Sequence, residues 1–90
     1  MSEVSMNREE IRDAVREYLL REFLPDEDPT ALTNQTPLVT SGILDSIATA
    51  RLVSYLEERF GIQFKAHEMT AVHLDTLDRI VESVEGKLQR

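Results

Sequence analysis

The spacing of apolar residues is the feature that most constrains how this chain folds. In three stretches of the 90-residue sequence, apolar side chains recur every three or four residues, which is the period that turns one face of an α-helix toward a core. Proline-containing or glycine-containing segments separate the stretches, and both residue types end helices. The pattern therefore predicts an all-α fold built on three main helices.

The first helix is predicted to begin after Asn7 and to end before Pro25. Asn7 and Glu10 have the spacing of a capping box, and Met6 stands where it could pack on Ile11 as a hydrophobic staple. We expect residues 1–5 to be frayed and residues 1–6 to form a flexible tail ahead of a single domain at 7–90. The apolar stripe of this helix consists of Ile11, Ala14, Val15, Tyr18, Leu19 and Phe23.

Residues 25–45 lack periodicity and are predicted to form a loop that is long for a compact domain. Leu20, opposite the first stripe, either meets this loop or is exposed. Gly42 can adopt the positive φ that a turn into a helix requires. Four acidic and no basic residues in the loop would steer a basic partner to this end, or are simply solvated. The expected apolar anchors are Leu32, Leu38, Val39, Ile43 and Leu44, and the acids are Asp26, Glu27, Asp28 and Asp45.

The second helix is predicted over residues 46–60, with Asp45 as its N-cap and Gly61 as its stop. Ser46 then lies in the first turn, at the positive end of the helix dipole, where a phosphate ester would be stabilised. At 100° per residue, Ile47 falls on the outer face, away from the core. The core face is expected to carry Thr49, Leu52, Val53, Leu56 and Phe60, and the outer face Ile47, Arg51, Ser54 and Glu58.

The remaining residues predict a short third helix and a longer last one. We expect the third at His67–Val72, with Met69 and Val72 turned inward, and the last to start near Asp75 or Thr76. The last helix has a clean stripe of Leu77, Ile80, Val81, Val84 and Leu88. The fold class predicted is a small four-helix bundle, with three main helices, a short third helix and a long loop between helices 1 and 2.

Composition excludes several functions. The chain has no cysteine, so disulfides and thiolate metal sites are ruled out. Its net charge of −7 argues against nucleic-acid binding, and no apolar run is long enough for a membrane span or a signal peptide. A chain this small has little room for a catalytic cleft. We expect a cytoplasmic, monomeric protein that is not an enzyme and has no catalytic residues.

Ser46 and the two histidines do not form a known catalytic or metal-binding pattern. Ser46 is not in a G-x-S-x-G elbow, and nothing identifies His67 or His73 as its base. Glu68 and Asp75 near the histidines lack a recognised ligand spacing. We therefore expect no metal site.

The segment TPLVTSGILDSI resembles the loop-to-helix segment of the acyl, peptidyl and aminoacyl carrier proteins, and the resemblance covers roughly residues 8–88, including EERFGI at the end of the second helix. In that family an Asp-Ser pair followed by an apolar residue bears a 4'-phosphopantetheine arm. The resemblance implies that Ser46 takes this arm from coenzyme A, and that Asp45 helps to position the metal and the serine in the transferase complex besides capping the helix.

The arm would supply the thiol that the chain lacks, and the thiol would hold an acyl or aminoacyl thioester. The implied partners are a phosphopantetheinyl transferase and the ligases or transferases that load and unload the arm. By the same resemblance, the second helix presents the partner surface. Many fatty acid carriers have an acidic residue where this chain has Arg51, so we expect a different choice of partners. The residues implied are Ile47, Ala50, Arg51, Ser54 and Glu58.

Two questions stay open on the sequence. The cargo is not determined, although GILDSI looks somewhat more like discrete aminoacyl and D-alanyl carriers than like housekeeping ones. The alternative from another class is an unmodified helical adaptor, in which the Ile47 face binds a partner helix and Ser46 is only part of the cap.

Overall fold

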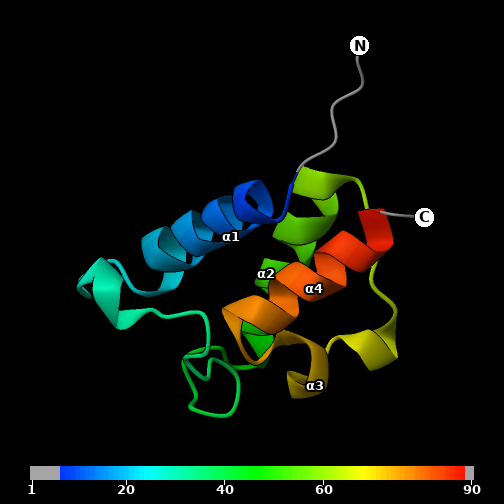
Figure 1. Ribbon diagram of the computed structural model, residues 1–90. Coiled ribbons are helices and arrows are strands. Elements are labelled where there is room, and N and C mark those ends of the chain that lie inside the picture. Colours follow the sequence, from blue (N-terminus) through cyan, green and yellow to red (C-terminus); the bar gives the residue numbers. More distant parts are fainter. Residues whose placement is uncertain (1–6, 89–90) are drawn as a thin grey trace.

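The structure is a computed structural model that describes residues 7–88, and this part of the chain contains helices and turns without a strand. Figure 1 shows the helices gathered into one bundle with a long excursion between the first two. The predicted four-helix class is confirmed. The predicted tail 1–6 and the staple residue Met6 lie outside the described residues. The elements are α1 (Arg8–Phe23), the 3-10 turn η1 (Pro29–Ala31), α2 (Ser46–Phe60), the 3-10 turn η2 (Ala66–Glu68), α3 (Ala71–Leu74) and α4 (Leu77–Leu88).

Local capping fixes the ends of the two longest helices. The Asn7 side chain accepts from the Glu10 amide at 2.8 Å, and the Glu10 carboxylate accepts from the Asn7 amide at 3.0 Å, which completes the predicted capping box. Gly61 ends α2 at φ 67°, and Gly42 turns the chain toward α2 at φ 90°. Both glycines occupy the left-handed region that other residues avoid, because a Cβ there meets the backbone.

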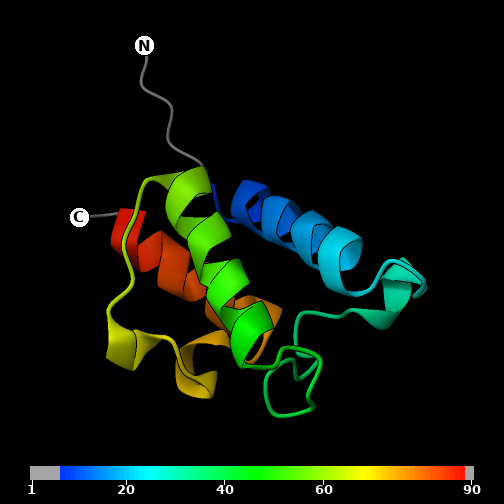
Figure 2. The ribbon, with the colours of Figure 1, turned by 180° about the vertical axis from the view of Figure 1, so that it is seen from behind.

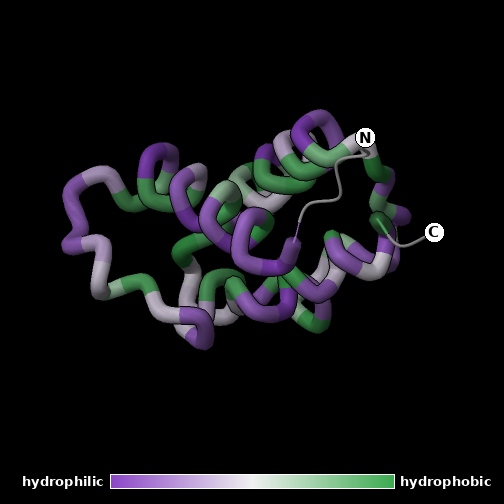
Figure 3. Tube along the Cα trace, turned by 45° about the horizontal axis from the view of Figure 1, so that its top comes forward, coloured by the Kyte–Doolittle hydropathy of each residue, from purple (hydrophilic) through white to green (hydrophobic). Residues whose placement is uncertain are grey.

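The predicted apolar stripes converge on one core, and the loop before α2 is anchored in it. Along the helices in Figure 3, hydrophobic and hydrophilic segments alternate, as expected for amphipathic helices. All five predicted loop anchors contact the core. Three of them, Leu32, Leu38 and Leu44, are at most 2% exposed, and Val39 and Ile43 are partly buried. Burial of these side chains holds the long loop against the bundle.

The prediction for the third helix was wrong in its limits and in one of its inward residues. The segment forms η2 and the four-residue α3 instead of one helix over 67–72. Val72 is 65% exposed, whereas Leu74 is fully buried; Met69 is partly buried and contacts the core, as predicted. Elements this short have no helical period of their own, so packing of Leu74 and Met69 decides their orientation.

Three arginines on one edge of α1 tie it to the rest of the molecule. Arg8, Arg12 and Arg16 are spaced four residues apart and so share one side of the helix. The ion pairs of Arg8 and Arg12 each contribute little alone, but with the Arg16 hydrogen bonds they connect this side of α1 to α4 and to the loop. The partners are the carboxylates of Glu85 for Arg8 and Asp78 for Arg12, and the carbonyls of Pro29 and Leu32 for Arg16.

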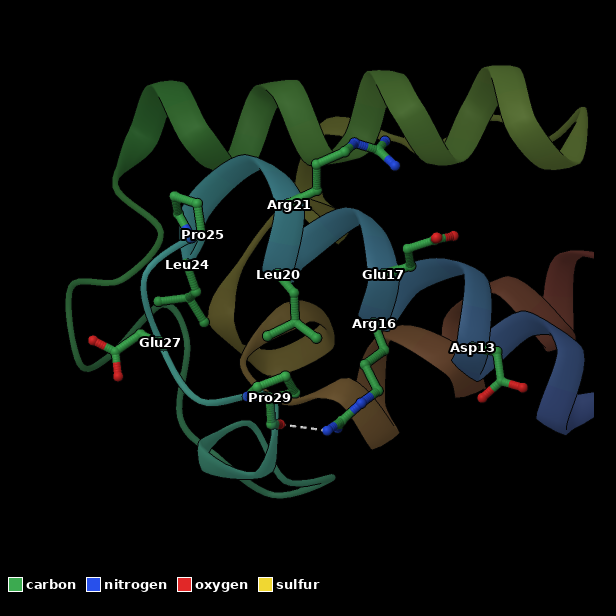
Figure 4. Close-up of a pocket in the computed structure, with 9 residues that line it drawn as sticks. All are labelled: Asp13, Arg16, Glu17, Leu20, Arg21, Leu24, Pro25, Glu27 and Pro29. Carbon is green, nitrogen blue, oxygen red and sulfur yellow. Dashed lines mark hydrogen bonds between the residues drawn. The ribbon is translucent and has the colours of Figure 1, made fainter.

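Leu20 meets the long loop, which resolves one open question from the sequence. It is half-buried and lines a groove between α1 and the loop together with Leu24, Pro25 and Pro29. Figure 4 shows Leu20 pointing toward Pro29, with the Arg16 guanidinium reaching the Pro29 carbonyl beside it. The Arg16 guanidinium thus binds the loop backbone beside this groove. We therefore assign the groove a structural role, which is to hold the loop against α1.

Candidate functional site

Ser46 is the first residue of α2, and Asp45 caps the helix in front of it. The Asp45 Oδ1 atom accepts from the Ala48 amide at 2.8 Å, and the Asp45 carbonyl accepts from the Thr49 amide at 2.8 Å. This confirms the predicted cap, which is worth about 1 kcal/mol. Ser46 itself is exposed. An exposed serine therefore stands at the N-terminal end of a 15-residue helix.

An open surface groove begins at Ser46 and follows α2. Ile47 on its rim is 73% exposed, and the apolar side chain has no core contact to explain its presence there. The groove brings together all the residues that the sequence assigned to the site except Asp45, which lies behind them as the cap. Its α2 side is lined by Ser46, Ile47, Ala50, Arg51, Ser54 and Glu58.

The other wall of this groove consists of two tyrosines that the sequence analysis did not assign to it. The rings of Tyr18, from α1, and Tyr55, from α2, stack with centroids 4.0 Å apart and planes 10° apart. Phe23 packs edge-on against Tyr18 at 5.7 Å. Burial raises the pKa of Tyr18, so the phenol stays neutral. The tyrosines could not be assigned from sequence because they meet only when α1 and α2 pack together.

Arg51 joins the groove to the end of α1. Its guanidinium lies 3.1 Å from the Glu22 carboxylate and 5.5 Å from the centroid of the Phe23 ring. Both contacts hold a side chain that is still 56% exposed. A positive charge is therefore presented on the first half of α2, near the serine, where many fatty acid carriers would present a negative one.

Asp75 holds the serine-bearing loop in place. Its Oδ1 atom accepts from the backbone amides of Val39 and Thr40, both at 2.9 Å, and of Leu38 at 3.2 Å. These bonds, with that from Thr40 first, lower the pKa of Asp75. Of the two residues at the expected start of the last helix, Thr76 caps it, because its hydroxyl accepts from the Arg79 amide at 3.2 Å, and Asp75 binds the loop instead.

The described residues offer no metal centre. Between Asn7 and Leu88, no three His, Asp or Glu side chains lie together as a metal would require, and His67 and His73 are not grouped with such ligands. In the same part of the chain, none of the helices has the length and apolar character needed to cross a bilayer.

The chain is thus a small helical bundle with an exposed serine at the capped start of α2. A family model described as the phosphopantetheine attachment site matches residues 9–84. The chain belongs to this carrier protein family, whose domains carry a covalently attached 4'-phosphopantetheine group. A comparison with curated proteins finds no match.

Membership of this family indicates the general role of the chain. Domains of this family act as non-catalytic carriers. A phosphopantetheinyl transferase and other enzymes that use the attached group are the partners that the family implies.

Proposed function

We propose that Ser46 bears the 4'-phosphopantetheine arm and that the chain shuttles a thioester-bound acyl or aminoacyl group between enzymes. One observation carries the assignment: Ser46 is exposed at the start of α2 and opens onto the groove. The family match spans this residue. The resemblance of the Asp-Ser-Ile sequence to the attachment motif supports the same choice.

The residues at the start of α2 suit a phosphodiester. The Ser46 hydroxyl is the oxygen that would join the phosphorus, losing its proton, while the bond to the nucleotide part of coenzyme A breaks. The helix N-terminus stabilises the negative phosphate that results. Asp45 keeps the helix capped and, in the transferase complex, would help to position the metal. The arm supplies the thiol that the chain lacks.

The surface offered to partner enzymes in this proposal is the outer face of α2. Ile47 would enter an apolar pocket of the partner, and Arg51 and Glu58 would set its orientation by charge. Residues 7–90 would form one domain that acts as a monomer in the cytoplasm. Ala50 and Ser54 complete the contact surface, since both line the groove on the same face.

Intact mass spectrometry tests the assignment of Ser46. After incubation with coenzyme A and a broad-specificity phosphopantetheinyl transferase, the wild-type chain should gain the mass of one arm and Ser46→Ala should gain none. Ser83→Ala is the matched control, because it removes a serine of α4 that does not line the groove, and this variant should still gain the arm. An unmodified adaptor would gain no mass in any of the three proteins.

A further inference from the structure

The groove that begins at Ser46 follows α2 for about three turns. Ser46 and Glu58, which both line it, are twelve residues apart in the chain, or about 18 Å along the helix axis at 1.5 Å per residue. Between them the floor is low, because the side chains of Ala50 and Ser54 are small. Figure 2 shows α1 lying beside α2 on this side. The groove is therefore a long, open depression on the surface, with Ser46 at one end and Glu58 at the other.

The tyrosine wall is rigid and presents carbon to the groove. The Tyr18 hydroxyl donates to the Arg51 carbonyl at 3.3 Å, and the Tyr55 hydroxyl donates to the Ala14 carbonyl at 3.2 Å. With both hydroxyls bound to backbone, the rings cannot turn their polar ends outward. Tyr55 remains half-buried, so part of its ring is accessible. A ligand in the groove would meet an apolar wall formed mainly by the Tyr55 ring, with the buried Tyr18 ring stacked behind it.

Polar groups lie at intervals along the opposite side. The exposed Ser54 hydroxyl and the Glu58 carboxylate can accept hydrogen bonds from amide N–H groups, and the Arg51 guanidinium is partly exposed near the serine end. The 4'-phosphopantetheine arm has an anionic phosphate at one end, a dimethyl-substituted carbon close to it and two amides beyond. Charged, apolar and hydrogen-bonding groups therefore follow one another along the arm in the same order as their counterparts along the groove.

The opposite side of α2 offers no comparable space. Leu52 and Leu56 of α2 and Leu77 and Ile80 of α4 are all 0% exposed and belong to one buried core. Seating an arm there would require this packed core to open, at the cost of the buried contacts. Seating the arm in the groove between α1 and α2 requires no opening of the core.

We propose that the 4'-phosphopantetheine arm of Ser46 rests in the groove between α1 and α2, against Tyr18 and Tyr55, rather than in the core. This inference rests on the proposed function, since it needs the arm on Ser46. In this placement Ala50, Ser54 and Tyr55 contact the arm while no partner enzyme is bound. A partner that docks on Ile47 would then meet the arm already lying along the same face of α2.

A spin label on the arm tests this placement without an enzyme assay. Because the chain has no cysteine, a maleimide nitroxide added to the modified protein attaches at the arm's thiol. Amide signals of Ala50, Ser54 and Tyr55 should lose most of their intensity in nitrogen–proton correlation spectra, while those of Met69 and Val72 should stay near the reduced-label reference. Shift differences between the unmodified and the modified, unlabelled protein should fall on the same groove residues.

Two arginine substitutions make the test specific. Ala50→Arg fills the groove with a long side chain that the helix tolerates, and it should abolish the signal loss at Ser54 and Tyr55. Val72→Arg is the matched control at an exposed position on α3, and it should leave the pattern unchanged. Ser54→Arg repeats the first test one turn further along, and the spectra themselves show that each variant is folded.

The outcomes separate the two proposals. Modification at Ser46 followed by equal signal loss on the α1 and α3 sides of α2 would overturn the groove assignment and leave the carrier function standing. Signal loss confined to core residues such as Leu56 and Ile80 would overturn it as well. No gain of mass on treatment with transferase would overturn both.

Discussion

Asp75 binds Thr40 twice, although 35 residues separate them in the chain: its Oδ1 atom accepts from the Thr40 amide at 2.9 Å and its Oδ2 atom accepts from the Thr40 hydroxyl at 3.0 Å. The same carboxylate accepts from the amide of Val39. Thr40 lies in the loop that delivers the serine, and Asp75 lies just before α4. The position of Ser46 therefore depends on a residue from the last quarter of the chain.

Asp75→Ala should loosen this loop more than it changes the helices. Loss of several hydrogen bonds to a carboxylate is expected to lower the free energy of unfolding by about 1–3 kcal/mol. Urea denaturation measures this loss, and hydrogen exchange should show faster exchange at the amides of Val39 and Thr40. Glu82→Ala, which removes an exposed carboxylate of α4, is the control and should change neither. Unaltered exchange in the Asp75 variant would contradict the anchoring role.

Glu68 should make stability depend on pH in the acid range. The Lys65 amide and the Lys87 ammonium, which donate to its carboxylate at 2.8 Å, lower the pKa of Glu68 from 4.5 to about 2. The stabilising contribution is complete above pH 4.5, and it is lost as pH falls toward about 2, because the unfolded chain takes up the proton first.

Glu68→Gln should therefore flatten the curve of unfolding free energy against pH in that range. Urea denaturation at a series of pH values measures the slope. Asp75 contributes in the same direction, since its pKa is also lowered, so some acid dependence should remain. Glu82→Gln serves as the comparison, and a slope that is equal in the two glutamine variants would count against the Glu68 contacts.

The two roles of Asp45 can be separated by two substitutions. Asp45→Ala removes the cap and should lower the free energy of unfolding by about 1 kcal/mol, whereas Asp45→Asn keeps an oxygen acceptor and should leave stability close to that of the wild type. If the carboxylate also helps to position the transferase metal, Asp45→Asn should slow attachment of the arm by roughly tenfold. Timed mass spectra measure this rate, and a wild-type rate would leave Asp45 with the cap alone.

Ile47 should matter to partners and not to folding. Because its side chain is 73% exposed, Ile47→Asp should change the free energy of unfolding by less than about 0.5 kcal/mol, while kcat/KM for the transferase falls by roughly tenfold or more if the residue is an anchor. Leu88→Asp is the control at another exposed apolar position, at the end of α4 (red in Figure 2), which lies away from the start of α2 (green). Similar losses in both variants would indicate a general effect of charge.

Features set by neighbours in the chain could be predicted from the sequence, and features set by distant residues could not. The cap at Asp45, the limits of α2 and the exposure of Ile47 follow from local spacing, and all three agree with the structure. The tyrosine wall depends on how α1 and α2 pack together, and the Asp75 anchor depends on how the loop packs against the segment before α4. Val72 was assigned to the wrong side for the same reason, since η2 and α3 are too short to have a period.

The edge of α1 formed by Arg8, Arg12 and Arg16 has a consequence for how the length of this chain can vary. Inserting one residue between Arg8 and Arg12 would rotate one arginine by about 100° relative to the others, and the partners on α4 and in the loop could not all follow. The same insertion at 25–28 would lengthen a connection that already lacks a helical register. Insertions and deletions among relatives should therefore gather just after α1 and be rare within it.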